Sequence, residues 1–372
     1  MVTILIAGGG TGGHVFPMVA VGDAVRAVDP SARVVYVGTA RGIEARVIPE
    51  RGDVLELLDI RPLRGAGLRG FATGAFHAAT SIPRARDLVR RLAPGAVLSV
   101  GGYAGGPVAL AARSLGVPVA LLEPNSVVGL SNRLLAPVVV RAYTAFPEAE
   151  RYLRPSVVLR AGVPLRRAFA RSPYVAKPDR VDVLVLGGSQ GAKALNEVVP
   201  RAIARAVAQG AALHVRHQTG RDRDVEVRGV YEALGVGARA EVVAFIDDVA
   251  AALGAADIVV ARSGASSYAE LCAVGRASIL VPYPHAADDH QLGNARSLER
   301  AGASVALPQV DATVGRLADE LRRLAADAPL RARMAAAAAA LGTPDAAVRV
   351  ASDLLSLARP RAAGGEGSRG GI

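Results

Sequence analysis

The feature that most constrains the fold is an alternation of short apolar runs with helical patterns, which starts twice along the chain. The runs are rich in Val, Ile and Leu, and the stretches between them carry apolar residues at helical spacing. Such alternation is typical of βαβ units and predicts parallel strands that are buried on both faces. In the first half, strands are predicted at residues 2–7, 33–37, 53–60, 96–100, 117–122 and 138–143.

The pattern restarts after a polar, proline-bearing segment at residues 170–180, and a chain of 372 residues exceeds what one core usually supports. We therefore predict an α/β protein with two Rossmann-like, doubly wound parallel-sheet domains that face each other across a cleft. The second set of strands is predicted at residues 181–188, 212–218, 241–245, 257–261 and 278–283. The predicted segments are an N-terminal domain at 1–162, a C-terminal domain at 163–343, a helix at 344–358 packing back on the first, and a disordered tail at 360–372.

Composition narrows the class of protein. The single cysteine, Cys272, excludes an intramolecular disulfide framework and a cysteine-ligated zinc site. No uninterrupted apolar stretch reaches the ~18 residues that a membrane span needs. The formal charge of +11 comes almost wholly from arginine and predicts anionic partners.

Much of this positive charge lies between Arg61 and Arg91, a stretch that contains seven arginines and one acidic residue, Asp87. Apolar and aromatic residues are interleaved with these arginines, a combination that favours an anionic membrane surface. Nucleic acid is the rival interpretation, but no stacking platform or DNA-binding motif accompanies the arginines, so no nucleic-acid partner is predicted. The predicted membrane patch consists of Arg64, Leu68, Arg69, Phe71 and Phe76.

Glycine-rich turns follow four of the predicted strands. Gly8, Gly10 and Gly13 satisfy G-x-G-x-x-G between a strand and a helix, where backbone N–H groups can approach a diphosphate. A NAD enzyme would place an acidic residue at the end of the second strand, whereas Arg41 near that position would suit NADP. Similar turns at residues 101–107, 187–192 and 262–270 favour two phosphate-bearing substrates held by both domains.

Several motifs together resemble one family closely. In order, they are GGGTGGHVFP, GGYAGGP, EPNSVVGLSNRLLA, GVPLR, GGSQGA, FIDD, RSGASSYAE and the HQLGNA segment. They are similar to the MurG family of GT-B glycosyltransferases, across residues 1 to about 300. The resemblance implies inverting transfer of N-acetylglucosamine from UDP-GlcNAc to the C4 hydroxyl of the MurNAc of lipid I, giving the β-1,4 linkage of lipid II in peptidoglycan synthesis. It also implies a peripheral location on the cytoplasmic face of the bacterial inner membrane.

The resemblance further implies which residues bind the donor. The diphosphate would meet Arg166, Ser189 and the helix that opens near Gly264, Ile246 would present main-chain groups to the uracil, and Glu270 would accept hydrogen bonds from the ribose. A capping box at Ser267 and Glu270 is the structural alternative. The implied donor set is Thr11, Gly12, Gly13, Asn125, Arg166, Ser189, Ile246, Ala265, Ser266, Ser267, Tyr268, Ala269, Glu270 and Gln291. Pro124 stands where many relatives carry glutamine, and Leu122 where some carry histidine. Ligand contacts that those side chains make in relatives therefore cannot be transferred to this chain.

The acceptor hydroxyl must lose a proton as it attacks the sugar, so a general base is expected. His14, with its near-neutral intrinsic pKa, is the first candidate, and Glu123 is the second. A purely structural or sugar-binding role is the alternative for His14, and a strand-end contact is the alternative for Glu123. The glycine-rich loops assigned to the acceptor diphosphate contain Gly9, Gly10, Gly102, Tyr103, Gly105 and Gly106.

No metal and no cofactor are predicted, although His285, Asp288, Asp289 and His290 crowd one loop. The expected partners are UDP-GlcNAc, lipid I, an anionic membrane surface, and other cell-wall or division proteins. Three alternatives stay open from the sequence: a transferase for another acceptor, an NADP-dependent oxidoreductase, and a nonenzymatic nucleotide-binding or scaffold protein.

Overall fold

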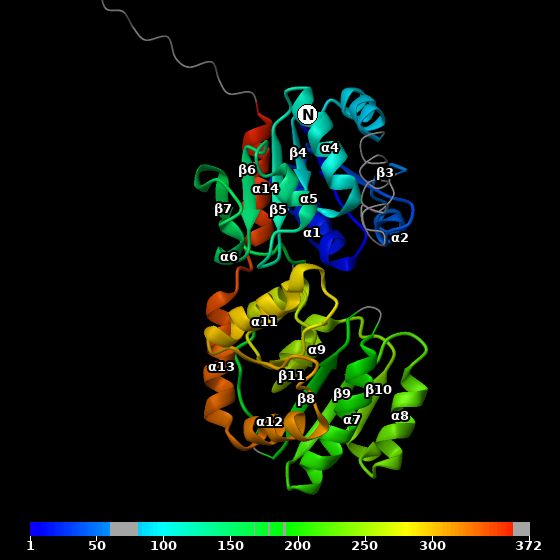
Figure 1. Cartoon of the computed structure of the whole chain (residues 1–372), viewed down its shortest axis with the longest axis vertical. Coiled ribbons are helices and arrows are strands. Elements are labelled where there is room, and N and C mark those ends of the chain that lie inside the picture. The colour runs from blue at the N-terminus through cyan, green and yellow to red at the C-terminus, as the bar shows by residue number, and fades with distance from the viewer. Residues whose placement is uncertain (60–80, 167, 178, 189–190, 360–372) are drawn as a thin grey trace, which may run out of the picture.

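The protein is described by a computed structural model, which describes residues 1–59, 81–166, 168–177, 179–188 and 191–359. Two sheets lie one above the other along the longest axis of the molecule, each with helices on both faces (Figure 1). All strand pairs between described residues are parallel. The prediction of two doubly wound parallel sheets is therefore confirmed.

The first sheet has seven strands in the order β3-β2-β1-β4-β5-β6-β7. Its strands are β1 (Thr3–Ala7), β2 (Arg33–Gly38), β3 (Leu55–Leu57), β4 (Ala96–Ser99), β5 (Val119–Glu123), β6 (Arg141–Thr144) and β7 (Val158–Arg160). Its helices are α1 (Gly12–Val28), α2 (Glu44–Glu50), a helix at residues 81–92, α4 (Gly102–Ser114), α5 (Leu130–Leu135), α6 (Pro147–Glu150), the 3-10 turn η1 (Pro155–Val157) and α14 (Ala346–Ala358).

The second sheet has six strands in the order β10-β9-β8-β11-β12-β13, which repeats the winding of the first. Its strands are β8 (Val181–Leu186), β9 (Leu213–Gln218), β10 (Ala240–Val243), β11 (Ile258–Ala261), β12 (Ala277–Leu280) and β13 (Ser304–Ala306). Its helices are α7 (Lys193–Ala208), α8 (Asp224–Ala233), η2 (Gly237–Arg239), α9 (Val249–Ala255), α10 (Ala265–Val274), η3 (Ala287–Asp289), α11 (His290–Arg300), α12 (Val314–Ala326) and α13 (Ala328–Leu341).

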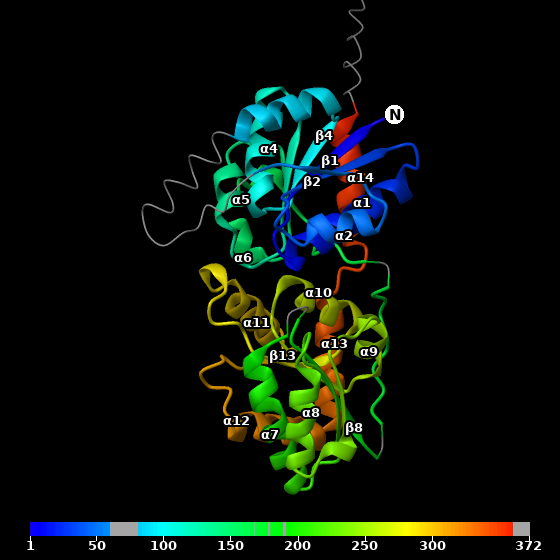
Figure 2. The same cartoon turned by 90° about the vertical axis from the view of Figure 1, so that its right-hand side faces the viewer.

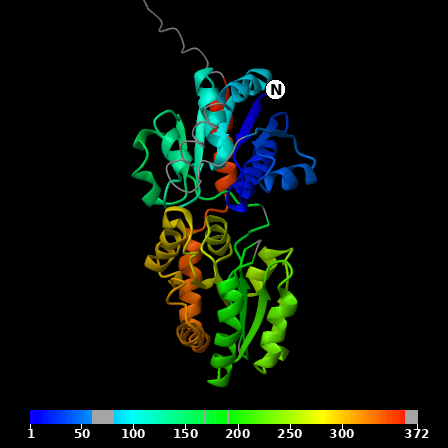
Figure 3. The same ribbon diagram turned by 45° about the vertical axis from the view of Figure 1, so that its right-hand side comes forward.

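Each sheet is covered on both faces because its strands are apolar throughout. In β1, Ile4 and Ile6 pack against α1 and α14, while Leu5 and Ala7 pack against α4 and the helix at 81–92. All four side chains are fully buried, and burying one such side chain contributes about 1.5–3 kcal/mol. The last helix, α14, runs beside the strands of the first domain (Figures 1 and 3).

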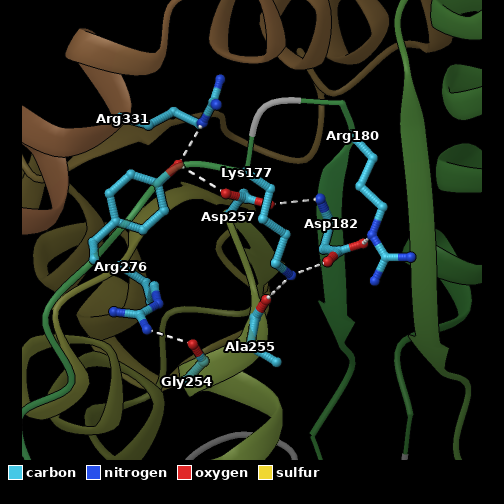
Figure 4. Close-up of polar contacts among 9 residues, drawn as sticks. Lys177, Arg180, Asp182, Gly254, Ala255, Asp257, Arg276 and Arg331 are labelled. Carbon is cyan, nitrogen blue, oxygen red and sulfur yellow. Dashed lines mark hydrogen bonds and ion pairs between the residues drawn. The ribbon is translucent and has the colours of Figure 1, made fainter.

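The segment that joins the two sheets is fixed to the second one. Lys177 forms an ion pair with Asp182, and its ammonium also donates to the carbonyl of Ala255 at 3.0 Å (Figure 4). Asp257 accepts from the backbone N–H of Asp182 and from the hydroxyl of Tyr174, both at 2.8 Å. These contacts anchor the segment that precedes β8 to the second domain. The proposed domain boundary at residue 162 stays a prediction.

Candidate functional site

The four glycine-rich turns lie at the two points where strand order reverses. β1 and β4 are neighbours, as are β8 and β11, yet in each pair the chain leaves toward opposite sides of the sheet. Doubly wound sheets bind ligands at the carboxyl ends of such strand pairs. The turns after these strands lead into α1, α4, α7 and α10.

The helices that follow these turns begin without a side-chain cap. Elsewhere Asp248, Thr313 and Asp327 cap α9, α12 and α13 by accepting a hydrogen bond from a first-turn N–H. The uncapped N-cap residues at the four turns are Thr11, Gly101, Ala192 and Gly264. Uncapped first-turn N–H groups and the helix dipole suit a diphosphate.

The two domains meet at this edge. α1 of the first domain contacts α10 of the second, and the two helices lie close together in Figure 2. The ring of Phe146 from the first domain packs on Tyr268 of α10 with centroids 4.3 Å apart. Arg300 also pairs with Glu148, and Arg133 lies 3.8 Å from Asp288. The carboxyl ends of both sheets are thus brought to one junction.

His14 lies in the first turn of α1, at this junction. Its Nδ1 is buried without a hydrogen-bond partner among the described residues. Burial lowers the pKa of His14, and the positive potential of His290 from the other domain lowers it further, while the Gly9 backbone and the negative charge of Glu44 act in the opposite direction. Near pH 7 the imidazole is therefore neutral, the state that accepts a proton.

Glu123, the second candidate base, accepts hydrogen bonds from the loop that follows it. It is 2% exposed, and its two carboxylate oxygens accept four hydrogen bonds. The donors are the backbone and side chain of Asn125 at 3.1 and 3.3 Å, Gly129 N at 3.0 Å and Asn132 Nδ2 at 3.0 Å. Burial nevertheless raises the pKa of Glu123. The geometry favours the strand-end role over proton abstraction.

Asn294, which the sequence reasoning did not single out, joins the two domains. It is fully buried, accepts from Ser126 N at 3.0 Å, and donates to Ser263 O at 3.0 Å and to Asn125 Oδ1 at 3.3 Å. Asn125 and Ser126 follow β5 of the first sheet, whereas Ser263 follows β11 of the second. The predicted donor residue Asn125 is thereby held at the junction. The HQLGNA motif contained Asn294, but only the fold reveals its partners.

The donor segment at residues 265–270 forms the first six residues of α10. The side chains of Ala265, Tyr268 and Ala269 are buried in the core, so they can offer a ligand only their backbone. Ser266 Oγ is buried and has no hydrogen-bond partner among the described residues. The capping-box alternative is wrong, because the N-cap of α10 is Gly264 and Ser267 lies inside the helix.

Glu270 and Arg166 approach each other beside this helix. Burial raises the pKa of Glu270 to about 7, and the positive charge of Arg166 partly opposes that shift. The guanidinium of Arg166 lies 5.5 Å from the ring centre of Phe16 and 5.9 Å from that of Phe169. Arg166 therefore sits between α1 of the first domain and α10 of the second.

The other donor candidates are placed as follows. Ile246 is buried in the core that α10 shares, which leaves its main chain for a ligand. Gln291 is the second residue of α11; its Oε1 accepts from Tyr283 N at 3.0 Å, and its backbone carbonyl accepts from Ser263 Oγ at 2.8 Å. Thr11, Gly12 and Gly13 form the N-cap and the first two residues of α1.

The acceptor glycines fall into two groups. Gly9, Gly10 and Gly102 have positive φ angles of 133°, 95° and 74°, and a Cβ at Gly102 would collide with the Gly9 carbonyl, so the two loops pack together. Gly105 instead allows α4 to approach β4, because a Cβ atom there would lie 2.5 Å from Ser99 Oγ, so packing explains this glycine without a ligand. A Cβ atom at Gly106 would lie 3.4 Å from Ser131 Oγ, an ordinary contact distance, so packing does not require a glycine there.

Some predicted residues lie outside the described part of the chain. They are Ser189, the side chain of Tyr103, and the membrane-patch residues Arg64, Leu68, Arg69, Phe71 and Phe76. In the loop near α11, no three metal-ligating side chains come together among the described residues. Within the described ranges, no helix is long and apolar enough to cross a bilayer.

A cavity of about 430 Å³ lies elsewhere, lined by polar residues that include Arg180, His214 and Arg239. These residues stand at the amino ends of β8, β9 and β10. Ligands of doubly wound sheets bind at the opposite, carboxyl ends. The cavity is therefore separate from the candidate site.

Comparison with known proteins identifies the family. The model of the glycosyltransferase family 28 N-terminal domain matches residues 4–144, and that of the C-terminal domain matches residues 182–350. The UDP-N-acetylglucosamine--N-acetylmuramyl-(pentapeptide) pyrophosphoryl-undecaprenol N-acetylglucosamine transferase of Sorangium cellulosum (strain So ce56) is 70% identical, over 96% of this chain and 89% of that protein. The chain belongs to glycosyltransferase family 28. The protein of the same name from Anaeromyxobacter dehalogenans (strain 2CP-C) is 44% identical over 96% of this chain and 94% of its own length.

Solved structures agree with this family 28 assignment. The crystal structure of Acinetobacter baumannii MurG has a TM-score of 0.81 and 30% identity, and covers 96% of this chain and all of that one. A UDP-GlcNAc 2-epimerase from Neisseria meningitidis has a TM-score of 0.67 at 13% identity, covers 96% of this chain and all of that one, and shares the fold alone. As a family 28 chain, the protein is a glycosyltransferase, and the oxidoreductase and nonenzymatic alternatives are wrong.

Proposed function

We propose that this glycosyltransferase transfers N-acetylglucosamine from UDP-GlcNAc to the C4 hydroxyl of the MurNAc of lipid I, forming the β-1,4 linkage of lipid II. The observation that carries the proposal is the 70% identity to a curated transferase of that name across both domains. The junction supports it, because α10, which carries candidate donor residues, contacts α1, which carries His14.

In the proposed mechanism, neutral His14 accepts the proton of the C4 hydroxyl as that oxygen attacks the anomeric carbon. The bond from this carbon to the UDP oxygen breaks as the new bond forms on the opposite face, which inverts the configuration. The low pKa of His14 supports this role, because a general base must be unprotonated before it acts.

The leaving diphosphate gains charge as the bond breaks. Arg166 and the uncapped N-terminus of α10 lie on the second-domain side of the junction and would stabilise that charge. Ser266 Oγ, which is buried and has no hydrogen-bond partner among the described residues, would donate a hydrogen bond to UDP-GlcNAc. The Glu270 carboxylate would accept from the ribose hydroxyls.

A transfer assay with matched variants tests this function. Purified protein should release UDP from UDP-GlcNAc only when a lipid I analogue is present, and should form lipid II. His14→Ala should reduce turnover by about 10²- to 10⁴-fold with little change in donor affinity, because only proton transfer is lost. His214→Ala, at the amino end of β9, is the control and should behave as the wild type.

Two outcomes would contradict parts of the proposal. Unchanged turnover in His14→Ala would remove His14 as the base. Intact UDP-GlcNAc binding without lipid II formation would point to another acceptor, and running the assay with other UDP-sugars would then define the donor.

We also propose that the enzyme is a peripheral protein on the cytoplasmic face of the membrane, where its acceptor resides. The arginine-rich stretch at 61–91 supports this location, since each basic residue near an anionic surface contributes about 1 kcal/mol. Replacing Phe71 and Phe76 with serine should weaken flotation with anionic liposomes. Unaltered flotation would place the contact elsewhere.

A further inference from the structure

We propose that Glu44 is a positioning residue for this reaction, which fixes the first glycine-rich turn and so sets His14 against the acceptor hydroxyl. The inference rests on the proposed function. Glu44 begins α2, which follows the carboxyl end of β2, and its carboxylate reaches under the turn that follows β1.

The carboxylate connects two loops that are far apart in sequence. Its Oε2 accepts from Gly10 N at 2.8 Å, and its Oε1 accepts from Thr39 N at 2.9 Å and from Thr39 Oγ1 at 3.0 Å. Glu44 is fully buried, and Thr39 is 6% exposed. Hydrogen bonds to a charged acceptor are stronger than those between neutral groups, so this carboxylate holds both loops in place.

Three glycines pack around this carboxyl group. A Cβ atom at Gly9, Gly38 or Gly42 would collide with the Glu44 side chain. Gly9 also has a φ of 133°, which L side chains rarely adopt. The glycines on both loops are thus explained by the space that one carboxylate occupies, not only by the approach of a phosphate.

This arrangement changes what the turn can bind. Because Gly10 N–H points at Glu44, it is not available to an acceptor diphosphate. The N–H groups of Gly12 and Gly13, in the uncapped first turn of α1, are donors that this turn can still direct at an anion. Glu44 therefore selects which amides face the substrate.

Glu44 also acts on His14 through space. Its negative charge opposes the effect of burial on the pKa of His14, while His290 on α11 adds to that effect. A single group thus fixes the position of the base and keeps its basicity from falling further. A group that served only stability would not change the pH dependence of acceptor turnover.

The test compares Glu44→Gln with Glu50→Gln, the same change at the exposed end of the same helix. A glutamine can place an amide donor against Gly10 N–H or Thr39 N–H, so the turn should move. We expect the acceptor kcat/KM to fall about 100-fold in Glu44→Gln, as for a small displacement of a catalytic group. The UDP-GlcNAc dissociation constant should change less than the acceptor kcat/KM, because most of the implied donor residues lie in the second domain.

A second measurement does not depend on transfer activity. The pKa of His14, followed by NMR titration of the imidazole, should be lower in Glu44→Gln than in the wild type and unchanged in Glu50→Gln. If wild-type protein does not act on lipid I, the proposed function fails, while this titration still tests the role of Glu44.

Gly42→Ala is a second variant that tests the same inference if Glu44→Gln does not fold. Its Cβ would displace the carboxylate without removing the charge, so acceptor kcat/KM should fall in the same direction. The inference is overturned if folded Glu44→Gln or Gly42→Ala keeps wild-type acceptor kinetics, or if the His14 pKa does not move in Glu44→Gln.

Discussion

Glu123 and Glu270 are two carboxyls on opposite sides of the domain junction, the first buried and the second half-buried, and their hydrogen bonding differs. Glu123, at the end of β5, accepts four hydrogen bonds from its own loop. None of the hydrogen bonds between described residues ends on Glu270, whose pKa burial raises to about 7 while the charge of Arg166 opposes that shift. A carboxylate that accepts hydrogen bonds from its own loop stabilises the fold. A carboxylate that accepts none from the protein is available to bind a ligand.

The largest effect should come from truncating the bonded carboxyl. Glu123→Ala takes the acceptor from four donors, one buried and three part-buried, so the free energy of unfolding should fall by about 3–5 kcal/mol. Urea denaturation followed by circular dichroism measures this change. If Glu123→Ala is as stable as the wild type, the contrast between the two carboxyls fails on the structural side.

Truncating the other carboxyl should instead affect the ligand. In Glu270→Ala, UDP-GlcNAc should bind about 10- to 100-fold more weakly, because hydrogen bonds between the ribose and a charged acceptor are lost. The free energy of unfolding should not decrease, since the carboxylate that is removed is half-buried and accepts no hydrogen bond from the described residues. Calorimetry against Glu197→Ala, an exposed glutamate on α7, supplies the comparison. A stability loss equal to that of Glu123→Ala would erase the distinction.

The smallest effect is a pH dependence that only Glu270 should confer. Its pKa in the folded protein is about 7 against 4.5 ordinarily, so the folded state binds the proton more tightly. Stability from this group is present below pH 4.5 and is lost as the pH rises through about 7, by at most about 3 kcal/mol for this partly exposed side chain. Donor affinity has the opposite trend, because the ribose needs the carboxylate form.

The UDP-GlcNAc dissociation constant should therefore be about tenfold higher at pH 6 than at pH 8. Glu270→Gln should remove this dependence, and calorimetry at both pH values provides the readout. A pH-independent wild type would show that Glu270 is already ionised at pH 6.

Sequence patterns predicted the long strands because their apolar runs exceed the length that chance or a loop produces. Each predicted run contains a strand, but β7 and β13, three residues each, were missed. These two edge strands are defined by their pairing with β6 and β12, which only the fold shows.

The glycine turns were predicted for a related reason: each is a local signal next to a strand. The contacts of Glu44 and Asn294, and the four hydrogen bonds that Glu123 accepts, could not be predicted in this way. Glu44 and Gly10 are 34 residues apart, and Asn294 and Ser126 are 168 apart. No local pattern encodes such pairs, although the glycines at 38 and 42 beside Glu44 hint at a side chain that needs their space.

The last helix sets an order of events during biosynthesis. Val350 and Leu354 of α14 are fully buried in the same core as Ile4 and Ile6 of β1. Domains usually fold as they leave the ribosome, N-terminal first. Here the first domain to be translated lacks a wall of its core until the final helix emerges, after the second domain is complete. The first-made half is thus the last to finish, and a nascent chain arrested before residue 346 would expose the apolar face of β1 and α1.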